Sequence, residues 1–154
     1  MSPCGAQALM AAEFLGGRDL GDGFEIDDDR ARIDPDVVWR YLADWSYWGR
    51  GRTREFVIQT IEQSYRVVGL YQAGNQIGFA RVVSDGLTVA YLCDVFVLPA
   101  FQGRGLGQAL VQEAVEGAGL SGLKWILHTE DAHDLYRKFG FAEPDRRALE
   151  RRLS

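Results

Sequence analysis

The fold is decided by the stretch Val95-Phe96-Val97-Leu98-Pro99-Ala100-Phe101-Gln102-Gly103-Arg104-Gly105-Leu106-Gly107-Gln108-Ala109-Leu110-Val111. Its apolar first residues predict a buried strand, and its last residues predict the start of an amphipathic helix. The turn between them is rich in glycine, so its backbone can approach a ligand closely. Because the free N–H groups at the start of a helix bind anions, the stretch predicts a phosphate-binding site.

The spacing of the glycines excludes two common kinds of phosphate site. A P-loop needs Gly-Lys-Ser/Thr at the helix start, and the stretch 105–108 has neither the lysine nor the hydroxyl. A dinucleotide fingerprint needs the spacing G-x-G-x-x-G, which Gly103, Gly105 and Gly107 do not provide. A plain strand-to-helix link would explain one glycine, but not three alternating glycines behind the polar Gln102.

The composition is that of one ordinary globular domain. The chain has 154 residues, of which 47% are hydrophobic and 25% are charged. Its net charge of −5 argues against nucleic acid as a partner, because phosphate backbones need a basic surface. No apolar run approaches the length of a membrane span, and no secretory signal is evident. We therefore expect a cytoplasmic protein with no membrane partner.

The cysteines and histidines predict neither a disulfide framework nor a metal site. Cys4 and Cys93 are far apart in the sequence, and no close set of ligands has metal-binding spacing. Cys93 lies in an apolar run and is expected to be a small buried hydrophobe rather than a nucleophile. The isolated His128 and His133 are expected to be packing or surface residues.

The hydrophobic pattern predicts two helices, antiparallel strands, and then a strand, turn, helix, strand and helix. Gly140 is expected to end the last helix in a left-handed conformation. Residues 1–23, rich in Gly and Ala, are expected to be an N-terminal extension that is poorly ordered or forms a short helix, so that 24–154 form the single domain. The expected strands are 65–71, 77–83, 87–97 and 124–128, and the expected helices begin near residues 35, 54, 105 and 131.

A second segment points to a known family. The run Thr129-Glu130-Asp131-Ala132-His133-Asp134-Leu135-Tyr136-Arg137-Lys138-Phe139-Gly140-Phe141 has an alanine, a tyrosine and a Gly-Phe pair in order. Together with Gln102-x-x-Gly105-x-Gly107, it resembles the GNAT superfamily of acetyl-coenzyme A-dependent N-acetyltransferases. The resemblance covers residues 77–141 most clearly. It implies an α/β (α+β) fold with a mixed, mostly antiparallel sheet, helices on both faces and splayed central strands.

The resemblance also implies that acetyl-coenzyme A is the co-substrate. The strand would bind the pantetheine arm and the turn the pyrophosphate, with Arg104 adding a charged contact. Thr129 stands where many relatives have asparagine, so one pantetheine contact of the amide is lost. The residues expected to contact the cofactor are Val95, Phe96, Val97, Gln102, Gly103, Arg104, Gly105, Leu106, Gly107, Thr129 and Tyr136.

Two residues are candidates for the proton transfers. In the family pattern, Tyr136 occupies the place of the tyrosine that protonates the coenzyme A thiolate; otherwise it is a core aromatic whose hydroxyl finds any convenient partner. Asp94 is a charged residue within an apolar strand. It is either a base that deprotonates the amine, directly or through water, or a structural acid that caps a turn or pairs with an arginine.

The segment between the first two helices is expected to wall the acceptor cleft, as it tends to do in this superfamily. Aromatic side chains there would stack on a substrate, and arginines would bind a carboxylate. The alternative is that Trp45 and Trp48 anchor the helix pair into the core. If the arginines face the cleft, an acceptor with a carboxylate as well as an amine becomes attractive. The expected cleft residues are Tyr47, Trp48, Arg50 and Arg52.

The sequence thus predicts an N-acetyltransferase that moves an acetyl group from acetyl-coenzyme A to a primary amine of a small molecule or a protein. Transfer would be direct, in a ternary complex. The alternative is a GNAT-fold module that binds an acyl-coenzyme A as a sensor or regulatory subunit without turnover. Transfer of a longer acyl group also stays open. The expected assembly is a monomer or a homodimer.

Overall fold

The strands form one six-stranded sheet in the order of the sequence. The computed structural model describes residues 16–153. Neighbouring strands are antiparallel except for the last two, which are parallel, so the expected mixed, mostly antiparallel sheet is confirmed. The strands are β1 (Arg18–Gly21), β2 (Phe24–Asp27), β3 (Arg66–Gln72), β4 (Asn75–Ser84), β5 (Val89–Val97) and β6 (Lys124–Ile126).

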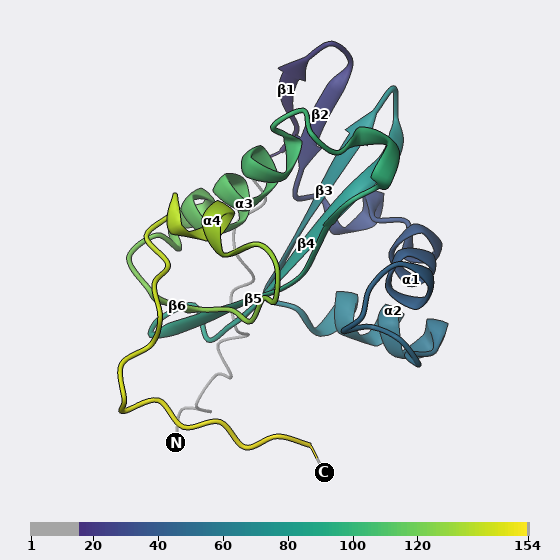
Figure 1. The fold of residues 1–154 in the computed structure, drawn as a ribbon. Coiled ribbons are helices and arrows are strands. Elements are labelled where there is room, and N and C mark those ends of the chain that lie inside the picture. The colour runs from purple at the N-terminus through teal and green to yellow at the C-terminus, as the bar shows by residue number, and fades with distance from the viewer. Residues whose placement is uncertain (1–15, 154) are drawn as a thin grey trace, which may run out of the picture.

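Helices cover both faces of this sheet, as expected (Figure 1). On one face lie α1 (Pro35–Asp44) and α2 (Arg54–Gln63), and on the other lie α3 (Leu106–Glu116) and the short α4 (His133–Arg137). The side chains of Asp34 and Thr53 begin α1 and α2 by accepting hydrogen bonds from N–H groups of the first turn. Shorter 3-10 turns are η1 (Arg30–Arg32), η2 (Pro99–Phe101) and η3 (Gly117–Gly119).

Each face of the sheet has its own hydrophobic core. The core under α3 is the larger, and it includes Leu110 and Val111 of the helix together with Tyr136 of α4. The core under α1 and α2 is built around Phe79 and Phe96 of the sheet. Both cores are needed to hold β4 and β5 in place, because these central strands bury side chains on both faces.

The strand β5 carries one extra residue at Asp94. Its pairing with β4 shifts there, so that Arg81 lies opposite Cys93 but Phe79 lies opposite Phe96. Asp94 has a φ of +54°, in the left-handed region that aspartate tolerates better than most residues. Its side chain consequently points to the α1–α2 side of the sheet. Four apolar side chains of the strand lie on the α3 side instead; these are Ala90, Leu92, Val95 and Val97.

The parallel strands β5 and β6 separate after a short contact. Their last paired residues are Tyr91 and Ile126, where β6 ends, two residues before the predicted end at 128. Because β5 continues to Val97, a gap opens between the strands. The expected splay is therefore present.

The sheet begins before the expected boundary at residue 24. β1 pairs with β2 through a tight turn at Asp22 and Gly23, both of which have positive φ. Such Asp-Gly turns favour a hairpin, whereas the sequence analysis treated these glycines only as breakers. The remainder of the predicted extension, residues 1–15, lies outside the described residues. Within the described part of the chain, every helix is too short or too polar to cross a membrane.

Candidate functional site

The glycine turn is held against the end of β5 by the side chain of Gln102. Its amide nitrogen donates to the carbonyl oxygen of Val97 at 2.9 Å. Gly103 and Gly105 have φ values of +79° and +77°, which a residue with a side chain rarely adopts. A Cβ atom at either position would point into open space. The glycines are therefore needed for their positive φ and not to avoid a steric clash, and the space in front of them is free.

The backbone of this turn presents a row of free donors. Among the described residues, no hydrogen-bond acceptor lies opposite the N–H groups from Gly103 to Gln108; the first bonded amide is that of Ala109. Gly105 is the N-cap of α3 and has no side chain to satisfy these donors. Leu106 anchors the helix start in the core. The guanidinium of Arg104 lies over the ring of Phe101, at the edge of the turn. The turn has the donors and the helix terminus that a pyrophosphate needs.

Further free backbone groups lie along the gap edge of β5, separated from those of the turn by the bonded amides of Leu98, Phe101 and Gln102. The N–H group of Leu98 donates to Ile77 of β4. Because antiparallel partners alternate along a strand, Phe96 also faces β4 with its backbone, and Val95 and Val97 face the gap. Phe96 thus turns its polar backbone groups away from the gap and only its neighbours expose theirs there, and its expected cofactor contact stays a prediction. Its ring instead stacks on Tyr41, with centroids 4.0 Å apart.

Tyr136 is held by the way α4 ends. Gly140 has a φ of +84°, its N–H donates to Arg137, and the N–H of Phe141 donates to the carbonyl of Tyr136. These two bonds define a Schellman cap, which confirms the expected left-handed end at Gly140. The helix is shorter than expected, however, because Thr129 and the residues up to Ala132 form the turn before it, with Thr129 Oγ1 accepting from Ala132 N–H.

The Tyr136 hydroxyl is chemically available. The residue is buried, and within residues 16–153 no hydrogen bond is made by its hydroxyl. Burial raises the pKa of Tyr136 to about 12, with further contributions from Asp131 and Tyr47. The group is therefore protonated at neutral pH and can act as a proton donor.

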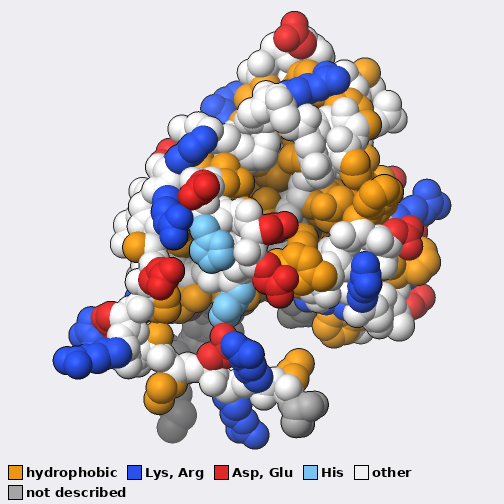
Figure 2. Space-filling model, in the orientation of Figure 1, with side chains coloured by type: hydrophobic (Ala, Val, Ile, Leu, Met, Phe, Trp, Pro, Cys, Tyr) orange, Lys and Arg blue, Asp and Glu red, His pale blue; other side chains and the backbone are white. Residues whose placement is uncertain are grey.

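The residues just before α4 interact with two tyrosines from the α1–α2 side of the fold. Tyr47 accepts a hydrogen bond from the N–H of Glu130 at 3.0 Å, joining the α1–α2 segment to the segment before α4. Burial and the charge of Asp131 raise the pKa of Tyr41. Figure 2 shows hydrophobic side chains in the recess between α4 and α1.

Asp94 is paired with two arginines and a tryptophan. Its carboxylate accepts from Trp48 Nε1 at 3.1 Å, from an Arg52 terminal nitrogen at 3.0 Å and from Arg81 Nε at 2.6 Å. These contacts match the second alternative for Asp94, an acid that pairs with arginine. Both oxygens are engaged, so removal of a proton from an amine would compete with these bonds.

The four expected cleft residues separate into two groups. Tyr47, Trp48 and Arg52 contact the site through the bonds described above, but Arg50 is exposed and contacts none of its described residues. The idea that tryptophans anchor the helix pair is wrong for Trp45, which is 65% exposed. The segment is fixed instead by the fully buried Ser46, whose hydroxyl bonds to both Leu42 and Gly49.

A polar chain crosses the gap between β5 and β6. The sequence analysis did not predict this chain. The Tyr91 hydroxyl lies 2.7 Å from Nδ1 of His128, and Nε2 of His128 lies 2.8 Å from a carboxylate oxygen of Glu150. Tyr91 sits where the two strands separate, so the chain leads from the gap to the solvent-exposed Glu150. His128 is exposed, in agreement with the expectation of a surface residue, and it also bridges Tyr91 and Glu150. Nothing local in the sequence links it to a tyrosine so far away.

Other reactive groups do not form a second centre. Cys93 is half-buried, and burial raises the pKa of its thiol to about 11, which makes it a poor nucleophile at neutral pH. Across the described range, no cluster of three or more His, Cys, Asp or Glu side chains is arranged to hold a metal ion.

A strand that splays from its parallel neighbour, a glycine turn opening a helix and a buried tyrosine define the acyl-coenzyme A-binding class of α/β fold. A family model described as "Acetyltransferase (GNAT) domain" matches residues 63–143. The chain belongs to the GNAT family of acetyltransferases, which confirms the resemblance drawn from the two motifs.

The similar proteins agree with this assignment. The uncharacterized N-acetyltransferase ycf52 of Gracilaria tenuistipitata is 31% identical over 68% of this chain and 60% of its own length. Serotonin N-acetyltransferase 2 of rice is 40% identical over 47% of this chain and 38% of its own length. The chain therefore spans less than two thirds of these curated relatives.

Solved structures show the same fold over more of the chain. A GNAT-family protein from Xanthomonas campestris superposes with a TM-score of 0.80 and 35% identity, covering 84% of this chain and 93% of that one. AAC(6')-Iy in complex with the bisubstrate analogue CoA-S-monomethyl-acetylneamine gives a TM-score of 0.61 at 19% identity, covering 85% of this chain and 99% of its own. The second likeness is one of fold alone.

Proposed function

We propose that this protein is an N-acetyltransferase that transfers the acetyl group of acetyl-coenzyme A directly to a primary amine in the same cleft. The observation that carries the proposal is the row of free N–H groups from Gly103 to Gln108, in the turn that follows the open edge of β5. A pyrophosphate at the turn and a pantetheine arm along Val95 and Val97 would lead the thioester into the gap, toward Tyr136.

The residues around the gap supply what the transfer needs. The amine nitrogen forms a bond to the acetyl carbon, and the bond from that carbon to sulfur breaks. The leaving sulfur takes the proton of the Tyr136 hydroxyl, which its raised pKa keeps in place until then. A gap-facing N–H of Val95 or Val97 polarises the acetyl carbonyl.

The proton of the amine leaves along the polar chain of Tyr91, His128 and Glu150. The Tyr91 oxygen accepts this proton while its own passes to Nδ1 of His128, and Glu150 stabilises the resulting imidazolium. Asp94 is instead a positioning residue, because its oxygens already hold Arg52, Arg81 and Trp48.

Thiol release tests this function. The protein is mixed with acetyl-coenzyme A and a panel of amines, amino acids and peptides, and free coenzyme A is measured together with the acetylated product. Cofactor affinity is measured separately by calorimetry. Amine-dependent release supports the enzyme. Cofactor binding with no release for any acceptor supports the sensor alternative, and absence of binding contradicts both.

A further inference from the structure

The turn before α4 carries a carboxylate that has no partner. Asp131 is exposed, and its side chain makes no hydrogen bond or ion pair with any residue of the described range 16–153. Its backbone is anchored on both sides: the N–H of Glu130 donates to the Tyr47 hydroxyl at 3.0 Å, and the carbonyl of Ala132 accepts from the N–H of Tyr136. The turn that carries this carboxylate is therefore tied both to the α1–α2 segment and to α4.

The charge of Asp131 acts on a tyrosine from each of these two sides. Burial is the main cause of the raised pKa of Tyr41 in α1 and of Tyr136 in α4, and the charge of Asp131 is the next cause for both. Because such an effect falls with distance, the carboxylate lies close to both hydroxyl groups. No arginine, lysine or histidine among the described residues has a comparable opposing effect on either pKa. Figure 2 shows acidic side chains at the edge of the recess between α4 and α1.

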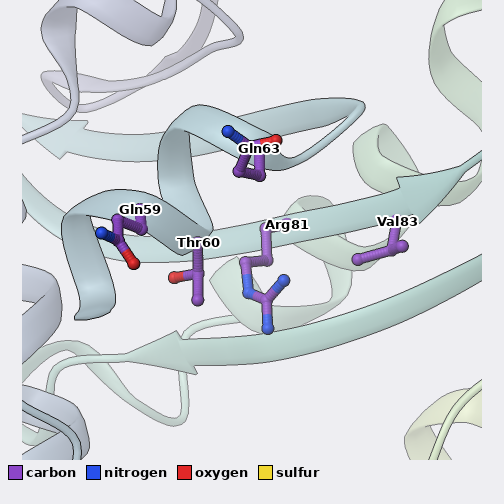
Figure 3. A pocket seen from close by; sticks show the side chains of 5 residues that line it. All are labelled: Gln59, Thr60, Gln63, Arg81 and Val83. Carbon is purple, nitrogen blue, oxygen red and sulfur yellow. The ribbon is translucent and has the colours of Figure 1, made fainter.

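The arginines of the neighbouring segment and strand are engaged elsewhere. Arg52 and Arg81 are both bonded to Asp94. Figure 3 shows the Arg81 side chain on β4, beside Thr60 of α2. These two positive charges therefore leave Asp131 without a counter-charge.

A hydroxyl without a partner lies close to the same carboxylate. Tyr136 is 9% exposed, and its hydroxyl bonds to no described residue. The oxygen is not sealed in the core, because the only side-chain nitrogen or oxygen found buried without a partner in residues 16–153 is the Tyr71 hydroxyl. The Tyr136 hydroxyl therefore opens on a space that a ligand can enter.

Exposed aromatic rings adjoin the turn. Tyr47, which holds the residue before Asp131, is 45% exposed, and Trp48 is 39% exposed. Their rings pack edge to face, with centroids 5.0 Å apart and planes at 82°. An unpaired carboxylate next to exposed aromatic rings suits an ammonium group, which a carboxylate attracts by charge and a ring attracts by its face.

We propose that Asp131 binds an ammonium group of the acceptor, so that the substrates are diamines of which one nitrogen is acetylated and the other stays charged. The inference rests on the proposed acetyl transfer. The reacting nitrogen must lose a proton before it attacks the acetyl carbon, whereas a carboxylate favours the protonated form of a nearby amine. The ammonium group at Asp131 is therefore the second one of the acceptor.

The depth of the two groups agrees with this arrangement. Asp131 is exposed, whereas Tyr136 is buried. An ammonium group at Asp131 thus stays near water, and the carbon chain of the acceptor leads inward to the hydroxyl that is proposed to act on the thioester. The negative charge of the chain, −5 overall, also favours the approach of a dication.

Matched diamines and monoamines test the site. The probes are 1,3-diaminopropane, 1,4-diaminobutane and 1,5-diaminopentane, compared with propylamine, butylamine and pentylamine. The two equivalent nitrogens of a diamine alone account for about twofold in kcat/KM, and we expect at least one diamine to exceed its monoamine about tenfold or more. Ratios no higher than this statistical factor for every pair would overturn the proposal. A higher kcat/KM for 2-phenylethylamine than for any diamine would also overturn it, because the rings alone would then select the acceptor.

Variants locate the preference. In Asp131→Asn the ratio between diamine and monoamine should fall to the statistical factor, whereas Asp131→Glu should keep part of it, because the charge remains. The matched control is Asp134→Asn, which removes an exposed carboxylate of α4 that is paired with Arg137 and should keep the ratio of the parent protein. Circular dichroism checks that each variant is folded. A ratio that Asp131→Asn leaves unchanged contradicts the site.

A binding measurement separates this inference from the proposed function. Calorimetry with each diamine is done on the protein with coenzyme A present. If no amine is acetylated but a diamine binds and Asp131→Asn abolishes this binding, the transferase proposal fails and the ammonium site stands. If amines are acetylated without preference for the diamines, the transferase proposal stands and the ammonium site fails.

Discussion

The ring of Phe141 packs edge-on against the ring of Tyr136, with centroids 5.9 Å apart and planes at 71°. The N–H of Phe141 also bonds to the Tyr136 carbonyl, so the residue after the cap holds both the backbone and the ring of the proposed acid. The cap at the end of this five-residue helix thus fixes the position of Tyr136.

Replacing Tyr136 by Phe should lower kcat about a hundredfold, because a general acid typically contributes a factor of this size or more. The KM for acetyl-coenzyme A should stay within about threefold, since the hydroxyl is proposed to act on the leaving sulfur. Steady-state thiol release measures both. Equal losses in kcat and cofactor affinity would assign Tyr136 to binding instead.

The pH profile gives a second check on Tyr136. Burial raises its pKa to about 12, so the hydroxyl holds its proton throughout the range in which a free tyrosine begins to ionise. Activity should therefore show no loss attributable to this group between about pH 7 and pH 10. An alkaline decline that disappears in Tyr136→Phe would contradict this expectation.

Gly140→Ala should destabilise the protein by about 1 kcal/mol, because a φ of +84° is unfavourable for a residue with a Cβ atom. The melting temperature should fall by roughly 2–4 °C in a domain of this size. Gly122→Ala is the control: its φ lies outside the left-handed region, and its Cβ would meet nothing. Equal melting temperatures for the two variants would show that the cap does not depend on Gly140.

His128→Gln should lower kcat about tenfold or more, because the proposed path for the amine proton then loses its acceptor. Tyr91→Phe should have a comparable effect, and the double variant should be little worse than either single one. His133→Gln replaces the other histidine, which is exposed at the start of α4, and serves as the control. Strictly additive losses would show that Tyr91 and His128 do not work as one unit.

Cys93 should react slowly with alkylating reagents. Burial raises the pKa of its thiol to about 11, so about one molecule in a thousand carries the reactive thiolate at pH 8. Intact-mass spectrometry after iodoacetamide treatment, with peptide mapping, gives the rate at Cys93. Alkylation as fast as that of free cysteine would show that the β5 bulge opens readily.

The parts of the site that the sequence predicted are those that depend on neighbours along the chain. The glycines need positive φ and the cap at Gly140 follows directly on its helix, so both are visible as local patterns. The bulge is also visible in the sequence. The apolar residues alternate at Ala90 and Leu92, and the alternation resumes one residue late, at Val95 and Val97. The sequence analysis did not use this change of phase.

Contacts between distant segments could not be predicted in the same way. Asp94 meets Arg52 across 42 positions, and Tyr91 meets His128 across 37. No periodicity encodes such pairs, because they depend on how two elements pack. For Asp94 the sequence therefore left two roles open, and only the fold shows which partners it has.

The hydrogen bond from Glu130 to Tyr47 has a kinetic consequence. It is the one described bond that ties the α1–α2 segment to the turn before α4, and an exposed bond of this kind is worth only about 1 kcal/mol. This bond alone therefore restrains the turn before α4 only weakly against the α1–α2 segment. In the proposed reaction, breaking this bond should therefore add little to the barrier that an acceptor meets if it enters between these two segments.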